Sequence, residues 1–347
     1  MVEVFPENQK CWLPYDKENP EILVKKEAET NWDYGYDPWK RPIEYLLDYA
    51  VINLDKVKGP TSHQVVAWIK QIVGKKAGHG GTLDPKVTGV LPVGIGKATK
   101  VLQLFLTAGK EYVVWMHIHK DVDEDEVITV LNKFEGEIIQ KPPLKSSVKK
   151  RPRKKKVYCI KVLEIDGRDW LLRISTEAGV YIRKLVHDIG KELEVGAHMQ
   201  QLRRTRVGAL EEDSNKYPLV TLQDIVDSLW FWKEEENEKY LRKVFLPPEV
   251  AAEHWKKIWI LDTAVEAIIH GADLTVRGIS KLYSNIKKGE FVAVYTLKNE
   301  LVCIGRAMMD SKEIIEADKG VAVDTKRVFL KKGLYPKKWK SKSTLTE

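Results

Sequence analysis

The chain has 347 residues, a hydrophobic content of 43% and a formal net charge of +8. This length predicts two or three domains, because a single hydrophobic core seldom serves so long a chain. It has no run of eighteen or more apolar residues and no apolar stretch near its N-terminus, which argues against a membrane or secreted protein and predicts a cytoplasmic one.

Residues 1–50 are rich in aromatic residues and proline and show no clean period, so we expect an extended wrap instead of a domain. The following segment predicts a helix. Apolar residues recur at helical spacing over 65–73, and either Thr61 or Ser62 can cap the N-terminus of that helix.

Residues 78–100 place one carboxylate, Asp84, in a glycine-dense loop ahead of an apolar run. Glycine permits positive φ and close approach to a ligand, and Pro85 keeps Asp84 out of a regular helix. We therefore expect a rigid turn that presents the Asp84 carboxylate. The alternative is an ordinary turn whose aspartate accepts hydrogen bonds from local amides.

The middle of the chain mixes strands and helices. Alternating apolar residues predict strands over 112–118 and 170–174, and helical spacing predicts a helix over 182–193. A further helix is expected over 127–134, capped by Asp123. Because these elements do not alternate strictly as βαβ units, the predicted fold class is α+β.

Positive charge is concentrated in residues 141–156, which carry nine basic side chains and no acidic one, so that the rest of the chain sums to 8 − 9 = −1. Three prolines and the lack of a helical period predict a loop or irregular arm. So dense a block of like charge suits a polyanion such as a phosphate backbone, although a solvated loop without a partner is the alternative. The candidate phosphate contacts are Lys145, Lys149, Lys150, Arg151 and Arg153.

Towards the C-terminus, the acidic stretch 233–239 suggests a surface connection. Beyond it, residues 292–295 and 301–304 flank Lys298-Asn299 as a predicted β-hairpin. A second basic stretch, 326–342, is weaker evidence for binding to a polyanion, because termini are often merely charged.

The three cysteines, Cys11, Cys159 and Cys303, are isolated and lack C-x-x-C spacing. Neither a disulfide framework nor a zinc site is indicated. We expect three reduced thiols and no metal.

The loop around Asp84 belongs to a long pattern of unusual residues, made up of 78–85 (GHGGTLDP), 88–92 (TGVLP) and 96–100 (GKATK). This pattern resembles the catalytic motif of the TruB-type pseudouridine synthases. Within that family the chain is most similar to the dyskerin branch, the catalytic subunits of box H/ACA guide-RNA particles, because residues 32–49 resemble the dyskerin leader. The resemblance implies an N-terminal extension over 1–50, a mixed-sheet synthase domain over 51–250 and a basic thumb loop over 141–156.

The resemblance also implies the site. Asp84 would be the nucleophile or base, and whether it forms a covalent adduct or abstracts a ribose proton stays open. Arg183 would pair with Asp84, keeping it ionised and oriented, unless it is a helix-surface arginine. Tyr112 would stack on the flipped base, with an aromatic facing the core as the alternative. Leu202 would form the apolar wall of the pocket, and His79 would position the flipped nucleotide.

Residues 258–331 resemble a PUA domain, a small β-rich RNA-binding barrel, and 332–347 would be a basic tail. In the family this domain grips the lower stem and the ACA trinucleotide of the guide RNA, so Gly271, Ala272 and Asp273 are candidate contacts. Asp273 has the alternative of a structural turn aspartate. The resembling segments include 270–274 (HGADL), 288–294 (KGEFVAV) and 319–323 (KGVAV).

The predicted function is isomerisation of uridine to pseudouridine in rRNA or tRNA, for which no cofactor is expected. The implied partners are guide RNA, substrate RNA and the small zinc-ribbon-like, glycine-arginine-rich-type and kink-turn-binding proteins of the particle, with no membrane. Two alternatives are a stand-alone tRNA synthase, which would lack the N-terminal wrap, and a non-catalytic RNA-binding scaffold, which would tolerate loss of Asp84 or Arg183. The absence of long lysine-rich tails favours the archaeal, cytoplasmic type over the nucleolar one.

Overall fold

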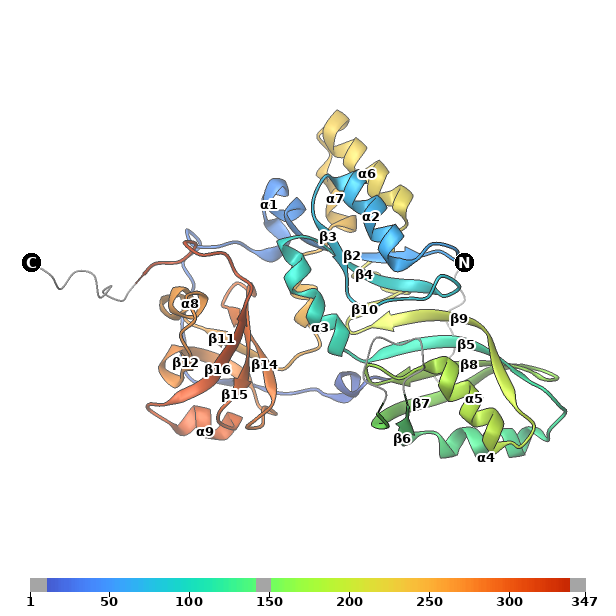
Figure 1. Cartoon of the computed structure of the whole chain (residues 1–347). Coiled ribbons are helices and arrows are strands. Elements are labelled where there is room, and N and C mark those ends of the chain that lie inside the picture. The colour runs from blue at the N-terminus through green and yellow to red at the C-terminus, as the bar shows by residue number, and fades with distance from the viewer. Residues whose placement is uncertain (1–10, 142–150, 338–347) are drawn as a thin grey trace, which may run out of the picture. The chain divides into compact units, whose positions relative to one another are not determined.

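Figure 1 shows the computed structural model, which describes residues 11–141 and 151–337. The described chain divides into two units. The first contains the residues up to Glu18 and Val51–Leu246, and the second contains Asn19–Ala50 and the residues from Pro247 onward. Mixed sheets and helices occur in both units, which confirms the α+β class.

The first unit is built on a nine-stranded sheet, in the order β2-β4-β9-β5-β8-β7-β6, with β3 beside β4 and β10 beside β9. The strand pairs β9-β5, β5-β8, β8-β7 and β7-β6 are antiparallel, whereas β4 and β9 are parallel. Its strands are β2 (Tyr49–Lys56), β3 (Ala77–His79), β4 (Thr88–Gly96), β5 (Lys110–Ile118), β6 (Gly136–Gln140), β7 (Arg153–Asp166), β8 (Asp169–Thr176), β9 (Ala197–Val207) and β10 (Leu210–Glu211).

Two helices, α4 and α5, cover one face of strands β5, β8 and β7 (Figure 1). Leu185, Val186 and Ile189 recur at helical spacing on α5 and are fully buried there. Burial of such side chains contributes roughly 1.5–3 kcal/mol each, before entropy is counted. The helices of this unit are α2 (Ser62–Val73), α3 (Leu102–Thr107), α4 (Glu124–Lys133), α5 (Ile182–Glu192), α6 (Leu222–Glu235) and α7 (Glu238–Val244), with 3-10 turns η2 (Pro14–Lys17) and η4 (Lys97–Lys100).

Most local predictions are confirmed. Thr61, not Ser62, caps α2, and its side chain accepts from the Gln64 amide in a reciprocal capping box. Asp123 caps α4. The acidic stretch 233–239, expected as a connection to the C-terminal part, instead forms the end of α6, the turn after it and the start of α7, inside the first unit.

The prediction of a loop throughout 141–156 is wrong for its last four residues, because β7 begins at Arg153 and pairs with β6. Nearby carboxylates neutralise part of the positive charge of this segment where β7 pairs with β6. The Lys154 ammonium lies 2.8 Å from the Glu137 carboxylate, and that of Lys155 lies 2.6 Å from Glu177. Residues 142–150, including Lys145, Lys149 and Lys150, lie outside the described residues.

The prediction of three reduced thiols is also wrong, because Cys11 and Cys159 form a disulfide across a sequence separation of 148. Their pairing depends on tertiary packing. The Ser175 hydroxyl donates to the Trp12 carbonyl at 2.7 Å, which seats the N-terminal segment against the sheet. Cys303 is a free, buried thiol, and burial raises its pKa to about 12.

The second unit is built on a seven-stranded sheet in the order β1-β13-β11-β14-β15-β16-β12. The predicted hairpin is confirmed as β14 and β15, whose turn places Asn299 at φ +68°. The strands are β1 (Ile22–Val24), β11 (Lys257–Ile260), β12 (Leu274–Thr275), β13 (Ile279–Tyr283), β14 (Phe291–Thr296), β15 (Leu301–Ala307) and β16 (Val321–Val328). The helices are α1 (Ile43–Leu47), α8 (Asp262–Ile269) and α9 (Ser311–Glu316), with 3-10 turns η3 (Pro38–Lys40), η5 (Pro248–Ala252) and η6 (Val276–Gly278).

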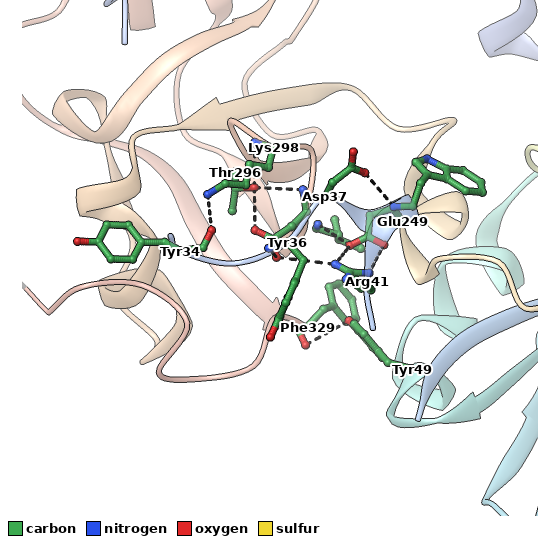
Figure 2. A network of polar contacts seen from close by, with 12 residues as sticks. Tyr34, Tyr36, Asp37, Arg41, Tyr49, Glu249, Thr296, Lys298 and Phe329 are labelled. Carbon is green, nitrogen blue, oxygen red and sulfur yellow. Dashed lines mark hydrogen bonds and ion pairs between the residues drawn. The ribbon is translucent and has the colours of Figure 1, made fainter. Parts of the chain in front are cut away.

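The N-terminal segment 19–50 is an integral part of this unit. It supplies β1, an edge strand that pairs with β13. Arg41, whose side chain is fully buried, forms a two-pronged bond to the Glu249 carboxylate at 2.7 and 2.8 Å (Figure 2). The Glu300 carboxylate lies 3.9 Å from Arg41 and accepts from the Tyr36 amide at 3.0 Å.

Lys298 is a second buried cation that contacts the N-terminal segment in the same network (Figure 2). The Lys298 ammonium donates to the carbonyl of Asn31 at 2.7 Å and to that of Tyr34. The Tyr49 hydroxyl donates to the carbonyl of Phe329 at 3.2 Å. An apparently featureless wrap is thus held by buried polar contacts to residues more than 200 positions later.

Candidate active site

Asp84 lies in the loop between β3 and β4, and that loop is held by contacts to its backbone. The Ser62 hydroxyl accepts from the Leu83 amide and donates to the Leu83 carbonyl, both at 2.9 Å. The ammonium of Lys56 donates to the carbonyls of Asp84 at 3.3 Å and Val87 at 2.9 Å. Both anchoring side chains are fully buried, so the loop presents Asp84 from a rigid support, as predicted.

Asp84 lines a cavity of about 740 Å³ in the first unit. Its wall brings together the predicted residues Tyr112, Arg183 and Leu202, which come from separate elements. The lining also contains residues that were not singled out from the sequence, among them Lys110, His187, His198, Met199 and Arg204.

The carboxylate of Asp84 pairs with Arg183, at 3.0 Å from Oδ2 to Nη2. This partner is distant in sequence, so Asp84 is not a turn aspartate that only satisfies local amides. Both side chains are more than half exposed, at 57% and 67%, and an exposed pair adds little to stability. The contact therefore orients the carboxylate instead of strengthening the fold.

Arg183 lies in the first turn of α5, whose start is held in place by a buried side chain. The Gln140 side chain on β6 accepts from the Tyr181 amide at 3.0 Å and donates to the Tyr181 carbonyl at 3.3 Å. Gln140 is 3% exposed, so this double contact is shielded from water. It fixes the first turn of α5 in the absence of an N-cap side-chain bond.

Tyr112 on β5 lines the cavity while packing against the core of the unit. The alternative of a core-facing aromatic therefore holds for part of the ring, and stacking on a flipped base stays a prediction. Burial raises the pKa of Tyr112, an effect that the nearby Arg204 partly offsets, and the phenol stays neutral at ordinary pH.

Lys110, two residues earlier on β5, is 6% exposed. Its ammonium donates to the carbonyls of Phe105, Leu106 and Ala108 at 2.8, 2.9 and 2.7 Å, at the end of α3. Burial, assisted by the positive charge of Arg204, lowers the pKa of Lys110 to about 7.

His79 does not line the cavity. It lies on β3 with its ring edge-on to that of His63, at a centroid distance of 5.0 Å. Its Nδ1 is buried and has no hydrogen-bond partner among the described residues. Burial, together with His63, lowers its pKa, which favours the neutral ring.

The remaining candidates lie elsewhere. Arg151 and Arg153 are exposed beside and at the start of β7. In the second unit, the exposed turn of Gly271, Ala272 and Asp273 is fixed to β16, because the Asp273 carboxylate accepts from the Thr325 amide at 2.9 Å. This bond gives Asp273 a structural role whatever it contacts in RNA.

Within residues 11–141 and 151–337, no group of histidine, cysteine and acidic side chains is arranged to hold a metal ion. In the same ranges, no helix has the length and apolar character needed to cross a membrane.

Comparison with protein families matches residues 70–182 to the TruB family pseudouridylate synthase N-terminal domain and 183–253 to the tRNA pseudouridylate synthase B C-terminal domain. Residues 10–66 match the DKCLD (NUC011) domain and 256–329 the PUA domain. A probable tRNA pseudouridine synthase B of Nanoarchaeum equitans is 67% identical over 335 residues, or 96% of this chain and 95% of the relative. The chain belongs to the TruB family of pseudouridine synthases.

The synthase also resembles solved structures over nearly its whole length. A chain of the Cbf5-Nop10-Gar1 complex is 58% identical, with a TM-score of 0.88 and coverage of 93% of the synthase and 98% of that chain. A chain of an H/ACA ribonucleoprotein bound to a substrate RNA containing 2′-deoxyuridine is 55% identical, with a TM-score of 0.87 and coverage of 94% and 100%. The predicted family, its dyskerin-like branch and the C-terminal PUA domain are confirmed.

Proposed function

We propose that the synthase isomerises uridine to pseudouridine in rRNA as the catalytic subunit of an H/ACA guide-RNA particle, with Asp84 as the reacting carboxylate. The proposal is carried by the pairing of Asp84 with Arg183 inside a cavity, in a chain that matches the Cbf5 of such particles almost end to end. Guide RNA, substrate RNA, Nop10, Gar1 and a kink-turn-binding protein are its proposed partners, and the cytoplasm of an archaeal cell is its proposed location.

The reaction conserves every atom. The bond between C1′ and N1 breaks, the base rotates, C5 bonds to C1′, and the proton lost from C5 is balanced by the one gained at nitrogen. No external oxidant or reductant is required. Asp84 would act as nucleophile at the sugar or as base, with its orientation maintained by Arg183.

Tyr112 and Leu202 would receive the flipped base. An extruded nucleotide needs a flat surface to replace its lost stacking, and the half-buried ring of Tyr112 offers one in the cavity wall. Leu202, on the strand paired with β5, lies opposite Val114 and contributes an apolar wall.

The test is a single-turnover assay of the assembled particle, programmed with a guide against a chosen rRNA uridine. Asp84→Asn keeps the shape of the side chain but removes its charge, so turnover should fall by a factor on the order of ten thousand or more while RNA affinity stays nearly unchanged. Appreciable turnover by this variant would assign the chemistry to another residue.

The second candidate function is guide-independent modification of tRNA, which the description of the relatives as probable tRNA pseudouridine synthases favours. The same assay distinguishes guide-independent modification of tRNA from guided modification of rRNA when tRNA is supplied and guide RNA is omitted. Turnover of tRNA alone at the guided rate would make the guide-dependent proposal incomplete. Wild-type protein inactive on both RNAs would favour the scaffold alternative.

A further inference from the structure

Arg204 lies where β9 meets both of its neighbours. It pairs with Gly89 of β4 on one side and with Tyr112 of β5 on the other. A β-carbon on Gly89 would lie 2.2 Å from the carbonyl oxygen of Arg204, so only glycine permits the two backbones to approach this closely. Arg204 is 2% exposed, yet it lines the cavity that contains Asp84.

The guanidinium of Arg204 connects three parts of the site. Its Nε donates to the Val90 carbonyl at 2.8 Å, and its Nη2 donates to the Gly81 carbonyl at 3.0 Å. The Tyr112 hydroxyl is within hydrogen-bonding reach of the same group. Gly81 precedes Asp84 by three residues in the same loop, so one rigid planar group reaches both the Asp84 loop and the Tyr112 hydroxyl.

No carboxylate among the described residues pairs with Arg204. A guanidinium stays charged in proteins, and an uncompensated buried charge is costly. The adjacent Arg203 shows the usual solution, since it pairs with Asp55 at 3.0 Å and Glu212 at 2.6 Å and does not line the cavity. Retention of so costly an arrangement in a cavity wall suggests a functional role.

We propose that Arg204 is a positioning residue for pseudouridine formation, which holds the Tyr112 hydroxyl and the Asp84 loop, through the Gly81 carbonyl, in one fixed geometry. The inference rests on the roles proposed above for Asp84 and Tyr112. Lysine would keep the positive charge, but its single nitrogen cannot replace the separate Nε and Nη2 donors that reach the Val90 and Gly81 carbonyls.

The experiment compares Arg204→Lys, Tyr112→Phe and their double variant in the assembled particle, by single-turnover rate and by substrate RNA affinity. Arg204→Lys should slow turnover by about 100-fold, because small misplacements of reacting groups have effects of that size. RNA affinity should change by no more than roughly twofold, since Arg204 is buried beneath the cavity surface. The double variant should lose less than the product of the two single losses, because both changes remove the same contact.

Arg203→Lys is the matched control, since it weakens a neighbouring arginine network outside the cavity. It should turn over within roughly twofold of the wild-type rate, with a loss of thermal stability similar to that of Arg204→Lys. Equal slowing by both variants would mean that Arg204 acts only through stability. Wild-type turnover by Arg204→Lys, or fully multiplicative losses in the double variant, would overturn the inference.

Three further outcomes keep the test decisive. If Arg204→Lys does not fold, Tyr112→Phe still tests whether the Tyr112 hydroxyl must be held by Arg204. The Tyr112→Phe change leaves Arg204 in place. It retains the ring and removes the hydroxyl, so an undiminished rate would show that the hydroxyl need not be held. If Asp84→Asn remains active, the proposed site is wrong. If Asp84→Asn is inactive while Arg204→Lys is normal, only the positioning inference is wrong.

Discussion

Lys110 links the protonation of one buried side chain to the stability of the cavity wall. Its three carbonyl partners lie at the end of α3, where backbone carbonyls lack helical partners and favour a positive charge. Burial opposes that charge and lowers the pKa of Lys110 to about 7. The native protein therefore releases this proton at a much lower pH than the unfolded chain, in which lysine titrates near 10.4.

Between about pH 7 and about pH 10, the unfolded state should bind more protons at this site than the native state does, so the contribution of Lys110 to the free energy of unfolding should rise with pH. Lys110→Met keeps the apolar stem and removes the titration. Urea unfolding at several pH values should show that the wild type gains stability over the variant as pH rises. A constant difference between the two proteins would contradict the lowered pKa.

The pairing of Asp84 with Arg183 could be predicted from the sequence, because both residues lie in segments that resemble motifs of the TruB-type family. It did not indicate Lys110 or Arg204 as buried site residues. A basic residue beside a predicted strand is usually on the surface, and nothing local shows that the Arg204 side chain reaches the Gly81 carbonyl in the Asp84 loop. His79 belongs to the same pattern as Asp84 but does not line the cavity.

At the scale of elements, the N-terminal segment 19–50 depends on Arg41. Arg41→Ala would leave the carboxylates of Glu249 and Glu300 buried without their cation, and should destabilise the second unit by about 3–5 kcal/mol. Hydrogen exchange of the β14 and β15 amides would report this loss. Arg277→Ala, at an exposed position of the same unit, should have little effect, and equal effects of both variants would argue against the network.

The basic arm gives a prediction at the same scale. Arg151→Gln with Arg153→Gln should weaken RNA binding similarly for different sequences, because phosphate contacts carry no base information. The slope of log affinity against log salt should become shallower by roughly 0.7–0.9 per lost contact. Lys233→Gln with Lys239→Gln, in the acidic stretch 233–239, is the control with equal charge loss. Identical slopes for all three proteins would identify the arm as a solvated loop.

At the scale of the whole molecule, the disulfide closes a loop over a separation of 148 residues. Chain-entropy models give such a crosslink roughly 4–5 kcal/mol of stabilisation. Cys11→Ser with Cys159→Ser should lower the melting temperature of the first unit, and a reductant should lower that of the wild type but not of the variant. Titration of three thiols in the unfolded, non-reduced protein would show that the bond is absent.

The domain families followed from sequence resemblance, whereas the assignment of residues 19–50 to the second unit did not. Their aromatic and proline-rich composition has no period that reports burial. The residues that bury them, such as Glu249, Glu300 and Phe329, are hundreds of positions away. The Cys11–Cys159 bond was missed for the same reason, because contact between segments so distant is decided by tertiary packing.

The assignment of residues 19–50 to the second unit has a consequence for synthesis on the ribosome. Ala50 is made 197 residues before Pro247, where the rest of that unit begins. Translation proceeds at about 5–20 residues per second, so roughly 10–40 s pass between synthesis of this segment and synthesis of the strands against which it packs. During that delay β1 is unpaired and Leu23, which packs against the core of the second unit in the folded protein, is available to other chains. A chaperone that binds short apolar segments should therefore bind nascent chains arrested between these two points.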